Sequence, residues 1–209
     1  MLLFLIRHAL TPHTGDRLSG WIPGISLSDE GRSQATAMVE RMQPVTLEAV
    51  YTSPLERCVE TARPLASSKG LRVRVREALG EVRYGDWEGK RLRTLAKTKL
   101  WRKVVSRPSD VRFPGGETVL ETQHRAVAAL QELRDKHDGK PIAVVTHADV
   151  IRLVIAHFAG VHIDLYQRLI VAPTSVSVLW LGSGGPRVIK VNDTGSLDGL
   201  TAPLNKPKP

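Results

Sequence analysis

Arg7 and His8 directly follow the apolar run of residues 2–6, and their side chains suit phosphate chemistry. A short apolar run predicts a buried strand, and open α/β sheets bind their ligands at the carboxyl ends of strands. The guanidinium group of Arg7 is a fixed cationic fork that matches a phosphate or a carboxylate. A neutral imidazole next to an anion held in this way can act as a nucleophile toward phosphorus. The pair alone predicts an anion contact at the end of a strand and nothing more specific.

Two further predicted strands end near basic side chains. Residues 49–52 predict a strand, and Arg57 falls on the first turn of the helix that follows it. Residues 142–146 form an apolar run of the kind that is buried on both faces of a parallel sheet, and His147 comes next. Because parallel strands end on one edge of a sheet, these groups can converge with His8. Two guanidinium groups, two imidazoles and a carboxyl group would supply the nucleophile, the charge stabilisers and the general acid of phosphoryl transfer without a metal.

The elements that must position these groups alternate between strand and helix, which predicts a single α/β domain over residues 1–209. Beyond the strands already named, the patterns predict strands over 71–75 (an edge strand), 175–181 and 187–191, and helices over 28–42, from 53 onward, 92–105, 117–136 and 149–159. The less regular segment 77–116, which contains several Gly and Pro residues, is expected to leave the sheet and cover the site like a lid. Residues 193–209 are poor in core residues and are expected to form a loose tail.

Composition favours a globular protein of a reducing compartment. Of the 209 residues, 42% are hydrophobic and 24% are charged, which is typical of a folded domain. Cys58 is the single cysteine, so an internal disulfide is excluded. The first residues do not resemble a signal peptide and no apolar stretch is long enough to span a bilayer, so we expect a cytoplasmic protein without a membrane partner. The formal net charge of +9 favours anionic partners, but the basic residues are spread along the chain without a nucleic-acid motif, so nucleic-acid binding is not expected.

Five segments, in their order along the chain, resemble motifs of the histidine phosphatase superfamily, whose members have the phosphoglycerate mutase-like fold. The segments are residues 7–11, 51–62, 79–89, 113–118 and 145–152. Together they cover nearly the whole chain. The resemblance implies a three-layer α/β/α sandwich with a mostly parallel central sheet.

The resemblance also implies a role for each residue of the site. His8 would be the nucleophile that forms a phosphohistidine, while Arg7, Arg57 and His147 would hold the phosphoryl oxygens and stabilise the transition state. Glu81 would protonate the leaving oxygen and then activate the water that cleaves the phosphohistidine. Burial would raise the pKa of Glu81 and the cationic pocket would lower it, so the net direction stays open at this point. Neither a cofactor nor a metal is implied.

Three positions depart from the usual motifs of the family. Ala9 stands where Gly is usual and Ala148 where Gly is common, and either alanine would be strained if the backbone there required a positive φ. Ala148 is nevertheless expected to contact the phosphate. Thr14 takes the place of a phosphate-contacting Asn, and its hydroxyl can still donate one hydrogen bond.

The function expected from these motifs is a metal-independent phosphomonoester hydrolase, of the histidine acid phosphatase type, that acts on a small phosphorylated metabolite. The compact middle segment favours this phosphatase over a cofactor-dependent phosphoglycerate mutase, although residues 83–85 (Arg-Tyr-Gly) partly match the mutase pattern. A non-catalytic phospho-ligand-binding protein is the alternative from another class, and the intact His8 and Glu81 argue against it. The sequence leaves the oligomeric state open, a homodimer included.

The remaining reactive side chains are assigned roles outside the chemical steps. Substrate specificity is assigned to the middle segment, with residues such as Arg83, Arg91, Arg93, Lys97 and Trp101, whose charge favours an acidic or multiply phosphorylated substrate. Structural roles are expected for the other histidines, and ordinary solvated positions for Arg63 and Arg125. For the tryptophans, packing is favoured over stacking on a base, with Trp21 and Trp87 expected near the pocket. The spacings of Cys58 to Arg63 and of Gly85 to Lys90 are each one residue too short for a cysteine-phosphatase loop and for a nucleotide P-loop, respectively.

Overall fold

The computed structural model describes residues 1–137 and 139–195, and these form a six-stranded sheet. The strands are β1 (Leu2–Arg7), β2 (Ala49–Thr52), β3 (Val73–Val75), β4 (Ile142–Thr146), β5 (Val176–Gly182) and β6 (Gly185–Asp193), in the order β3-β2-β4-β1-β5-β6. Strands β3, β2, β4 and β1 run parallel, whereas β5 pairs antiparallel with β1 and with β6. The mostly parallel sheet is confirmed, and β3 is the predicted edge strand.

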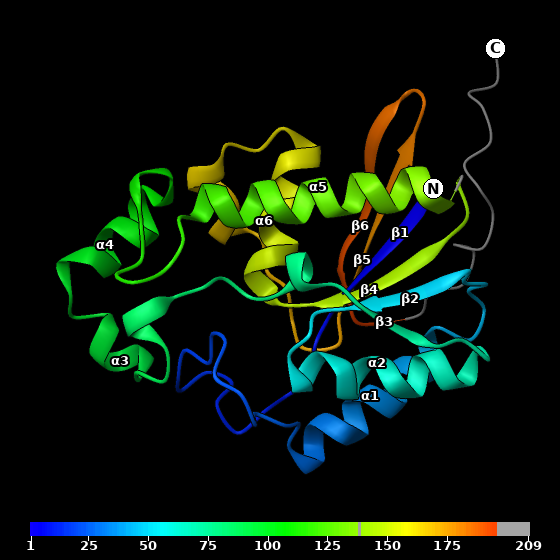
Figure 1. The fold of residues 1–209 in the computed structure, drawn as a ribbon, viewed down its shortest axis with the longest axis horizontal. Coiled ribbons are helices and arrows are strands. Elements are labelled where there is room, and N and C mark those ends of the chain that lie inside the picture. Colours follow the sequence, from blue (N-terminus) through cyan, green and yellow to red (C-terminus); the bar gives the residue numbers. More distant parts are fainter. Residues whose placement is uncertain (138, 196–209) are drawn as a thin grey trace.

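Helices cover both faces of the sheet, which confirms the three-layer α/β/α architecture (Figure 1). The main helices are α1 (Asp29–Arg41) and α2 (Glu56–Ser68) on one face, and α5 (Val119–His137) and α6 (Ala148–Ala159) on the other. Successive side chains of a strand point to opposite faces, and β1 follows this rule. Leu3 and Leu5 pack in the core under α5 and α6, whereas Leu2, Phe4 and Ile6 pack in the core under α1 and α2.

Local sequence signals account for some of the helix ends. Ser28 caps α1 as predicted, because its hydroxyl accepts a hydrogen bond from the backbone N–H of Gly31. Helix α6 ends at Gly160, which takes the left-handed conformation (φ 68°) that favours glycine. The start predicted for α2 near Ser53 is wrong, because the backbone stays extended through Leu55 and the helix begins at Glu56.

The middle segment 77–116 leaves the sheet and carries only short elements. These are the 3-10 turns η1 (Glu77–Leu79), η2 (Gly85–Trp87) and η3 (Pro108–Asp110), and the helices α3 (Leu92–Leu95) and α4 (Lys99–Ser106). The single helix predicted over 92–105 is wrong. Thr98 interrupts it, because its hydroxyl accepts from the backbone N–H of Trp101 and so caps a new helix. In Figure 1, α3 and α4 lie beyond the end of the sheet at which β1 finishes.

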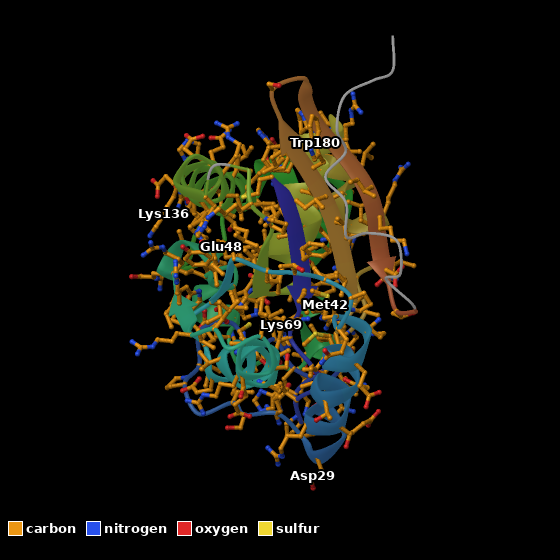
Figure 2. The ribbon with its side chains drawn as sticks, turned by 90° about the vertical axis from the view of Figure 1, so that its right-hand side faces the viewer. Asp29, Met42, Glu48, Lys69, Lys136 and Trp180 are labelled. Carbon is orange, nitrogen blue, oxygen red and sulfur yellow. The ribbon has the colours of Figure 1, made fainter. Side chains whose placement is uncertain are left out.

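The opposite edge of the sheet carries the beginnings of the parallel strands. Figure 2 looks onto this edge, where Met42 and Lys69 follow α1 and α2, Lys136 closes α5, and Glu48 precedes β2. The predicted catalytic residues Arg7, His8 and His147 lie instead where the parallel strands end, on the opposite side of the sheet.

The end of the chain differs from the prediction in one respect. Strand β6 runs through Asp193, so this residue belongs to the sheet rather than to a loose tail. The rest of the predicted tail, from residue 196 onward, lies outside the described residues. Among the helices that the structure describes, none combines the length and the apolar character needed to cross a bilayer.

Candidate active site

The three basic strand ends meet because β2, β4 and β1 are neighbours in the sheet. The backbone N–H of His8 donates to the carbonyl oxygen of Thr146 (2.9 Å), so His8 and His147 follow paired strand ends. Their imidazole rings lie edge to face, with centroids 5.2 Å apart. Arg57 reaches the same point from the first turn of α2. The parallel register therefore produces the convergence that the sequence pattern predicted.

A cavity of about 330 Å³ opens over this point. The predicted site residues that line it are Arg7, His8, Thr14, Arg57, Glu81 and Ala148. His147 lies behind them and has no exposed surface. The structure thus brings all seven predicted residues to one place, six of them in the cavity wall and one directly behind it.

His8 is held as a neutral imidazole with one open nitrogen. Its Nδ1 lies 2.8 Å from the carbonyl oxygen of Ala9, and a carbonyl can only accept, so Nδ1 carries the proton and Nε2 keeps its lone pair. Burial lowers the pKa of His8 to about 3, and the nearby Arg57 and Arg7 add to this effect. The ring is therefore unprotonated near neutral pH, which is the state that a nucleophile needs.

The two arginines each leave a buried nitrogen without a partner. Arg7 donates from Nη1 to the carbonyl oxygen of Val171 (2.7 Å), and Arg57 donates from Nη2 to that of Gly20 (2.9 Å). Within the described residues, Arg7 Nε and Arg57 Nη1 are buried and find no acceptor. Buried donors are normally satisfied, so two unpartnered guanidinium nitrogens on residues that line one cavity favour a site for an anion there.

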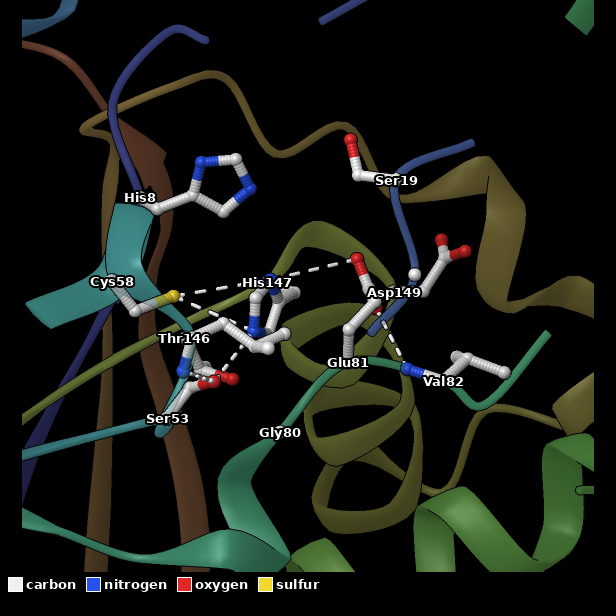
Figure 3. A network of polar contacts seen from close by, with 12 residues as sticks. His8, Ser19, Ser53, Cys58, Gly80, Glu81, Val82, Thr146, His147 and Asp149 are labelled. Carbon is white, nitrogen blue, oxygen red and sulfur yellow. Dashed lines mark hydrogen bonds and ion pairs between the residues drawn. The ribbon is translucent and has the colours of Figure 1, made fainter. Parts of the chain in front are cut away.

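His147 is fixed by buried polar contacts, and Figure 3 shows those to Ser53, Cys58 and Glu81. Its Nδ1 lies 3.3 Å from Arg57 Nη2, which can only donate, so Nδ1 accepts and Nε2–H donates to the hydroxyl of Ser53 (2.8 Å). The thiol of Cys58 packs 3.4 Å from Nε2. Burial, together with the positive charge of Arg57, holds the pKa of His147 well below its usual value. Ser53 was not singled out from the sequence, although it lies inside one of the family-like segments.

Glu81 faces His147 across the floor of the site (Figure 3), with 3.6 Å between its Oε2 and the Nδ1 of the ring. Its other oxygen accepts from the backbone N–H of Val82 (3.0 Å). Burial and the nearby carboxylate of Asp149 together raise the pKa of Glu81 to about 7, against the opposing effect of Arg57. The net shift in the pKa of Glu81, whose direction the sequence left open, is therefore upward. Near neutral pH this carboxyl group can give or take a proton.

Arg125 holds the segment that carries Glu81, so the expectation of an ordinary solvated residue is wrong. From α5, its guanidinium donates to the backbone carbonyl oxygens of Ala78, Gly80 and Glu81 at 2.7–2.9 Å. It also pairs with Glu117 at 2.6 Å. Helical periodicity places Arg125 on a polar face, but only the tertiary structure shows what that face meets.

The departures from the family motifs are accommodated without strain. Among the described residues, Thr174 and Asn192 are the only residues other than glycine with positive φ, so Ala9 and Ala148 are both unstrained. Ala148 begins α6, where the helix dipole favours negative charge. The hydroxyl of Thr14 accepts from the backbone N–H of Thr11 (3.0 Å) and shapes the loop after β1.

The rest of the cavity wall contains residues to which the sequence gave no such role. They are mainly Tyr84, Asp149, Arg152, Tyr166 and Gln167. Trp87, which was expected near the pocket, also lines it. Of the residues expected to set specificity, Trp101 lines the cavity, whereas Arg83, Arg91, Arg93 and Lys97 do not. Asp149 and Arg152 lie inside a family-like segment, which is the only sequence signal that points to them.

Fold and site together define an α/β protein with an anion pocket built from two histidines and two arginines. Comparison with known proteins identifies the family. The chain matches the family model of the histidine phosphatase superfamily (branch 1) over residues 3–194. It therefore belongs to that superfamily, as the motifs indicated, and it is an enzyme.

Relatives include both phosphatases and mutase-like proteins. Phosphoserine phosphatase 1 of Hydrogenobacter thermophilus is 27% identical over 195 residues, which cover 92% of each chain. Phosphoglycerate mutase-like protein 4 of Arabidopsis thaliana is 34% identical over 155 residues, which cover 72% of this chain and 67% of the relative. Among solved structures, Bacillus stearothermophilus YhfR superposes with a TM-score of 0.87 at 28% identity, covering 93% of this chain and 98% of that chain.

Proposed function

We propose that the protein is a phosphomonoester hydrolase that acts through a phosphohistidine formed on His8. The observation that supports this most directly is the pair of buried cationic nitrogens without a partner, Arg7 Nε and Arg57 Nη1, beside an imidazole with an open Nε2. A phosphate group has the charge and the acceptor oxygens that these donors lack. The substrate is a small phosphorylated metabolite that fits the cavity of about 330 Å³.

Two displacements at phosphorus make up the reaction. In the first, the lone pair of His8 Nε2 attacks phosphorus, the bond to the ester oxygen breaks, and the leaving oxygen takes the proton of Glu81. Arg7 and Arg57 balance the charge on the non-bridging oxygens. His147, which is neutral and donates its single N–H to Ser53, instead positions Arg57 through the 3.3 Å contact of its Nδ1. In the second, Glu81 takes a proton from water, the water oxygen attacks phosphorus, and the P–N bond breaks with its electrons returning to His8. Free phosphate leaves, and both side chains are back in their starting states.

The shifted pKa values suit this sequence of steps. His8, with a pKa lowered to about 3, is unprotonated near neutral pH, as the proposed nucleophile must be. Glu81, with a pKa raised to about 7, is mostly protonated at pH 6 and can donate to the leaving oxygen. Neither step needs a metal. Among the described residues, no three His, Cys, Asp or Glu side chains are grouped so that they could hold one.

The proposal is tested by incubating the protein with p-nitrophenyl phosphate in the presence of EDTA. We expect release of phosphate that His8→Ala abolishes and that the matched control His157→Ala, an exposed histidine of α6, retains. Alkaline quenching followed by peptide mass spectrometry should find the phosphoryl group on His8. Turnover that EDTA abolishes, or a phosphoryl group on another residue, would contradict the mechanism.

A parallel assay separates the alternatives. It supplies 3-phosphoglycerate together with 2,3-bisphosphoglycerate. Rapid interconversion of phosphoglycerates without net release of phosphate would identify a mutase. Binding of phosphate without turnover of any phosphomonoester would identify a binding protein.

A further inference from the structure

Glu81 lies in a stretch of the chain that is neither helix nor strand. The turn η1 ends at Leu79 and η2 begins at Gly85, and the backbone between them follows no regular hydrogen-bonding pattern. A general acid must nevertheless come within hydrogen-bond reach of the oxygen that it protonates. The position of the Glu81 carboxyl group therefore depends on contacts with other elements.

Arg125 of α5 binds this stretch with its whole guanidinium group. Its Nη1 donates to the carbonyl oxygens of Ala78 (2.8 Å) and Gly80 (2.9 Å), and its Nη2 donates to that of Glu81 (2.7 Å). Nε and Nη2 also donate to the two carboxylate oxygens of Glu117, at 3.0 and 2.6 Å. A guanidinium group has five N–H donors, so the fork of Arg125 is fully used in holding this backbone.

Trp21, in the loop after β1, reaches the same carbonyl group. Its indole Nε1 donates to the carbonyl oxygen of Glu81 (2.6 Å). The ring packs directly on the backbone of Gly80, where a Cβ would lie 2.2 Å from Trp21 Cζ2. The guanidinium group of Arg83 covers the ring, 3.8 Å from a ring centroid. The main chain at Glu81 is thus held by two side chains that are far apart in the sequence.

The turn that carries Trp21 also holds Arg57. The carbonyl oxygen of Gly20 accepts from Arg57 Nη2 (2.9 Å). Residues 20 and 21 therefore connect the arginine that is proposed to bind the phosphate with the carboxyl group that is proposed to protonate the leaving oxygen. The placement of one group relative to the other depends on this turn.

We propose that Arg125 and Trp21 are positioning residues, which hold Glu81 where its carboxyl group reaches the leaving oxygen. The inference rests on the proposed function, in which Glu81 gives its proton to that oxygen. Neither Arg125 nor Trp21 lines the cavity. Both act through the carbonyl group of Glu81 and not on the substrate.

The test compares two aryl phosphates that differ in their need for a proton. 2,4-Dinitrophenolate leaves without protonation, whereas phenolate, the conjugate base of an acid with a pKa of about 10, needs a proton from Glu81 near neutral pH. The measured quantity is kcat/KM for 2,4-dinitrophenyl phosphate divided by kcat/KM for phenyl phosphate. Since kcat/KM covers the steps up to release of the phenol, hydrolysis of the phosphohistidine does not enter this ratio.

Arg125→Met should raise the ratio at least about tenfold, because a misplaced general acid loses much of a contribution of about a hundredfold or more. Arg134→Met is the matched control, since Arg134 lies on the same helix and pairs with Asp135 instead. A smaller fraction of folded enzyme lowers both kcat/KM values equally. A purely structural role of Arg125 would therefore leave the ratio unchanged, and that result would overturn the inference.

A second variant guards against a failure of Arg125→Met to fold. Trp21→Phe removes one of the two donors to the carbonyl oxygen of Glu81 and keeps an aromatic ring in place. It should raise the ratio at least about threefold. If Arg125→Met yields no folded protein, this value decides, and an unchanged ratio overturns the inference.

A double variant tests whether Arg125 acts through Glu81. In a Glu81→Gln background the carboxyl proton is absent, so Arg125→Met should change the ratio less than about twofold. The release of the phenol is followed in the first turnover, because this step does not need the second role of Glu81. An equal rise of the ratio in both backgrounds would contradict the inference.

A readout without turnover separates this inference from the proposed function. If the wild type hydrolyses neither ester, the proposed function fails, but the burial that raises the pKa of Glu81 to about 7 can still be measured. Urea unfolding gives the stability difference between Glu81→Gln and its parent at pH 5 and at pH 8, and the change in this difference reports the shifted pKa.

The Arg125→Met background, or Trp21→Phe if that protein does not fold, should reduce this change to less than about half. A carboxyl group that is no longer held in place gains water, and its pKa returns toward the ordinary value. The charged side chains that act on it, Arg7, Arg57 and Asp149, lie on other elements and are not substituted. An undiminished change would overturn the inference.

Discussion

Replacing Glu81 by Gln should make the protein more stable at alkaline pH, because the wild type holds a buried carboxylate there. The Glu81 side chain is 13% exposed, and burial raises its pKa from 4.5 to about 7. Between pH 4.5 and pH 7, the folded state therefore binds more protons at this residue than the unfolded state does. The favourable contribution is complete below about pH 4.5 and is lost as the pH rises through 7.

The size of the effect follows from the two pKa values. A difference of one pKa unit between the folded and unfolded states corresponds to about 1.4 kcal/mol in the free energy of unfolding. Linkage then gives a cost of less than about 1 kcal/mol at pH 5 and about 3 kcal/mol at pH 8 in the free energy of unfolding. Gln does not titrate, so whatever else the substitution changes is nearly the same at both pH values. The stability of Glu81→Gln relative to wild type should thus rise by about 2 to 3 kcal/mol from pH 5 to pH 8.

The measurement is urea unfolding of both proteins at pH 5, 6, 7 and 8, in buffers free of phosphate and sulfate because bound anions would stabilise the folded state. Glu132→Gln is the matched control, since Glu132 is an exposed carboxylate of α5. A stability difference between Glu81→Gln and wild type that stays constant across this range would refute the reasoning.

Three further predictions follow from the contacts of the site and its loops. Asp149→Asn removes the negative charge that raises the pKa of Glu81, so the decline of kcat/KM at alkaline pH should move about one pH unit lower, as a pH–rate profile will show; an unmoved profile would exclude this role. Arg57→Met removes the guanidinium, with its unpartnered nitrogen, of a residue that lines the cavity, and calorimetry should find phosphate bound at least about tenfold more weakly; unchanged affinity would place the anion elsewhere. Gly31→Ala would put a Cβ 2.0 Å from the backbone oxygen of Leu10, so urea unfolding should show a loss of more than about 2 kcal/mol, and a loss below about 0.5 kcal/mol would contradict the close approach.

The sequence predicts secondary structure best where a local, repeated pattern of residues marks the element. Strands β1, β2 and β4 fall within a residue of their predicted bounds, because continuous apolar runs are typical of strands buried on both faces. The order of the sheet then brings their ends together, so the convergence of His8, Arg57 and His147 follows from parallel topology. The segment 92–105 was predicted less well, since the capping hydroxyl of Thr98 is a single polar group inside an otherwise helical pattern.

Contacts between distant segments could not be predicted in this way. Arg125 lies more than 40 positions from the carbonyl oxygens of Ala78, Gly80 and Glu81 that it binds, and no periodicity in α5 records them. The direction in which the pKa of Glu81 moves also depends on such contacts. The pKa rises because the effects of burial and of the Asp149 carboxylate exceed the opposing effect of the Arg57 guanidinium. Their balance depends on distances in the folded structure.

A bound anion would relieve several unfavourable features of the site. Arg7 and Arg57 each bury a donor without an acceptor, and burial beside these positive charges holds the pKa of both His8 and His147 low. A bound dianion would supply acceptors to the open donors and opposite charge to the guanidinium groups. The free energy that the folded chain gives up to keep the site open is therefore recovered when the anion binds. This coupling explains why the site combines unsatisfied arginines with neutral histidines. The same burial leaves His8, the proposed nucleophile, unprotonated, and it leaves donors for which an anion would supply the acceptors.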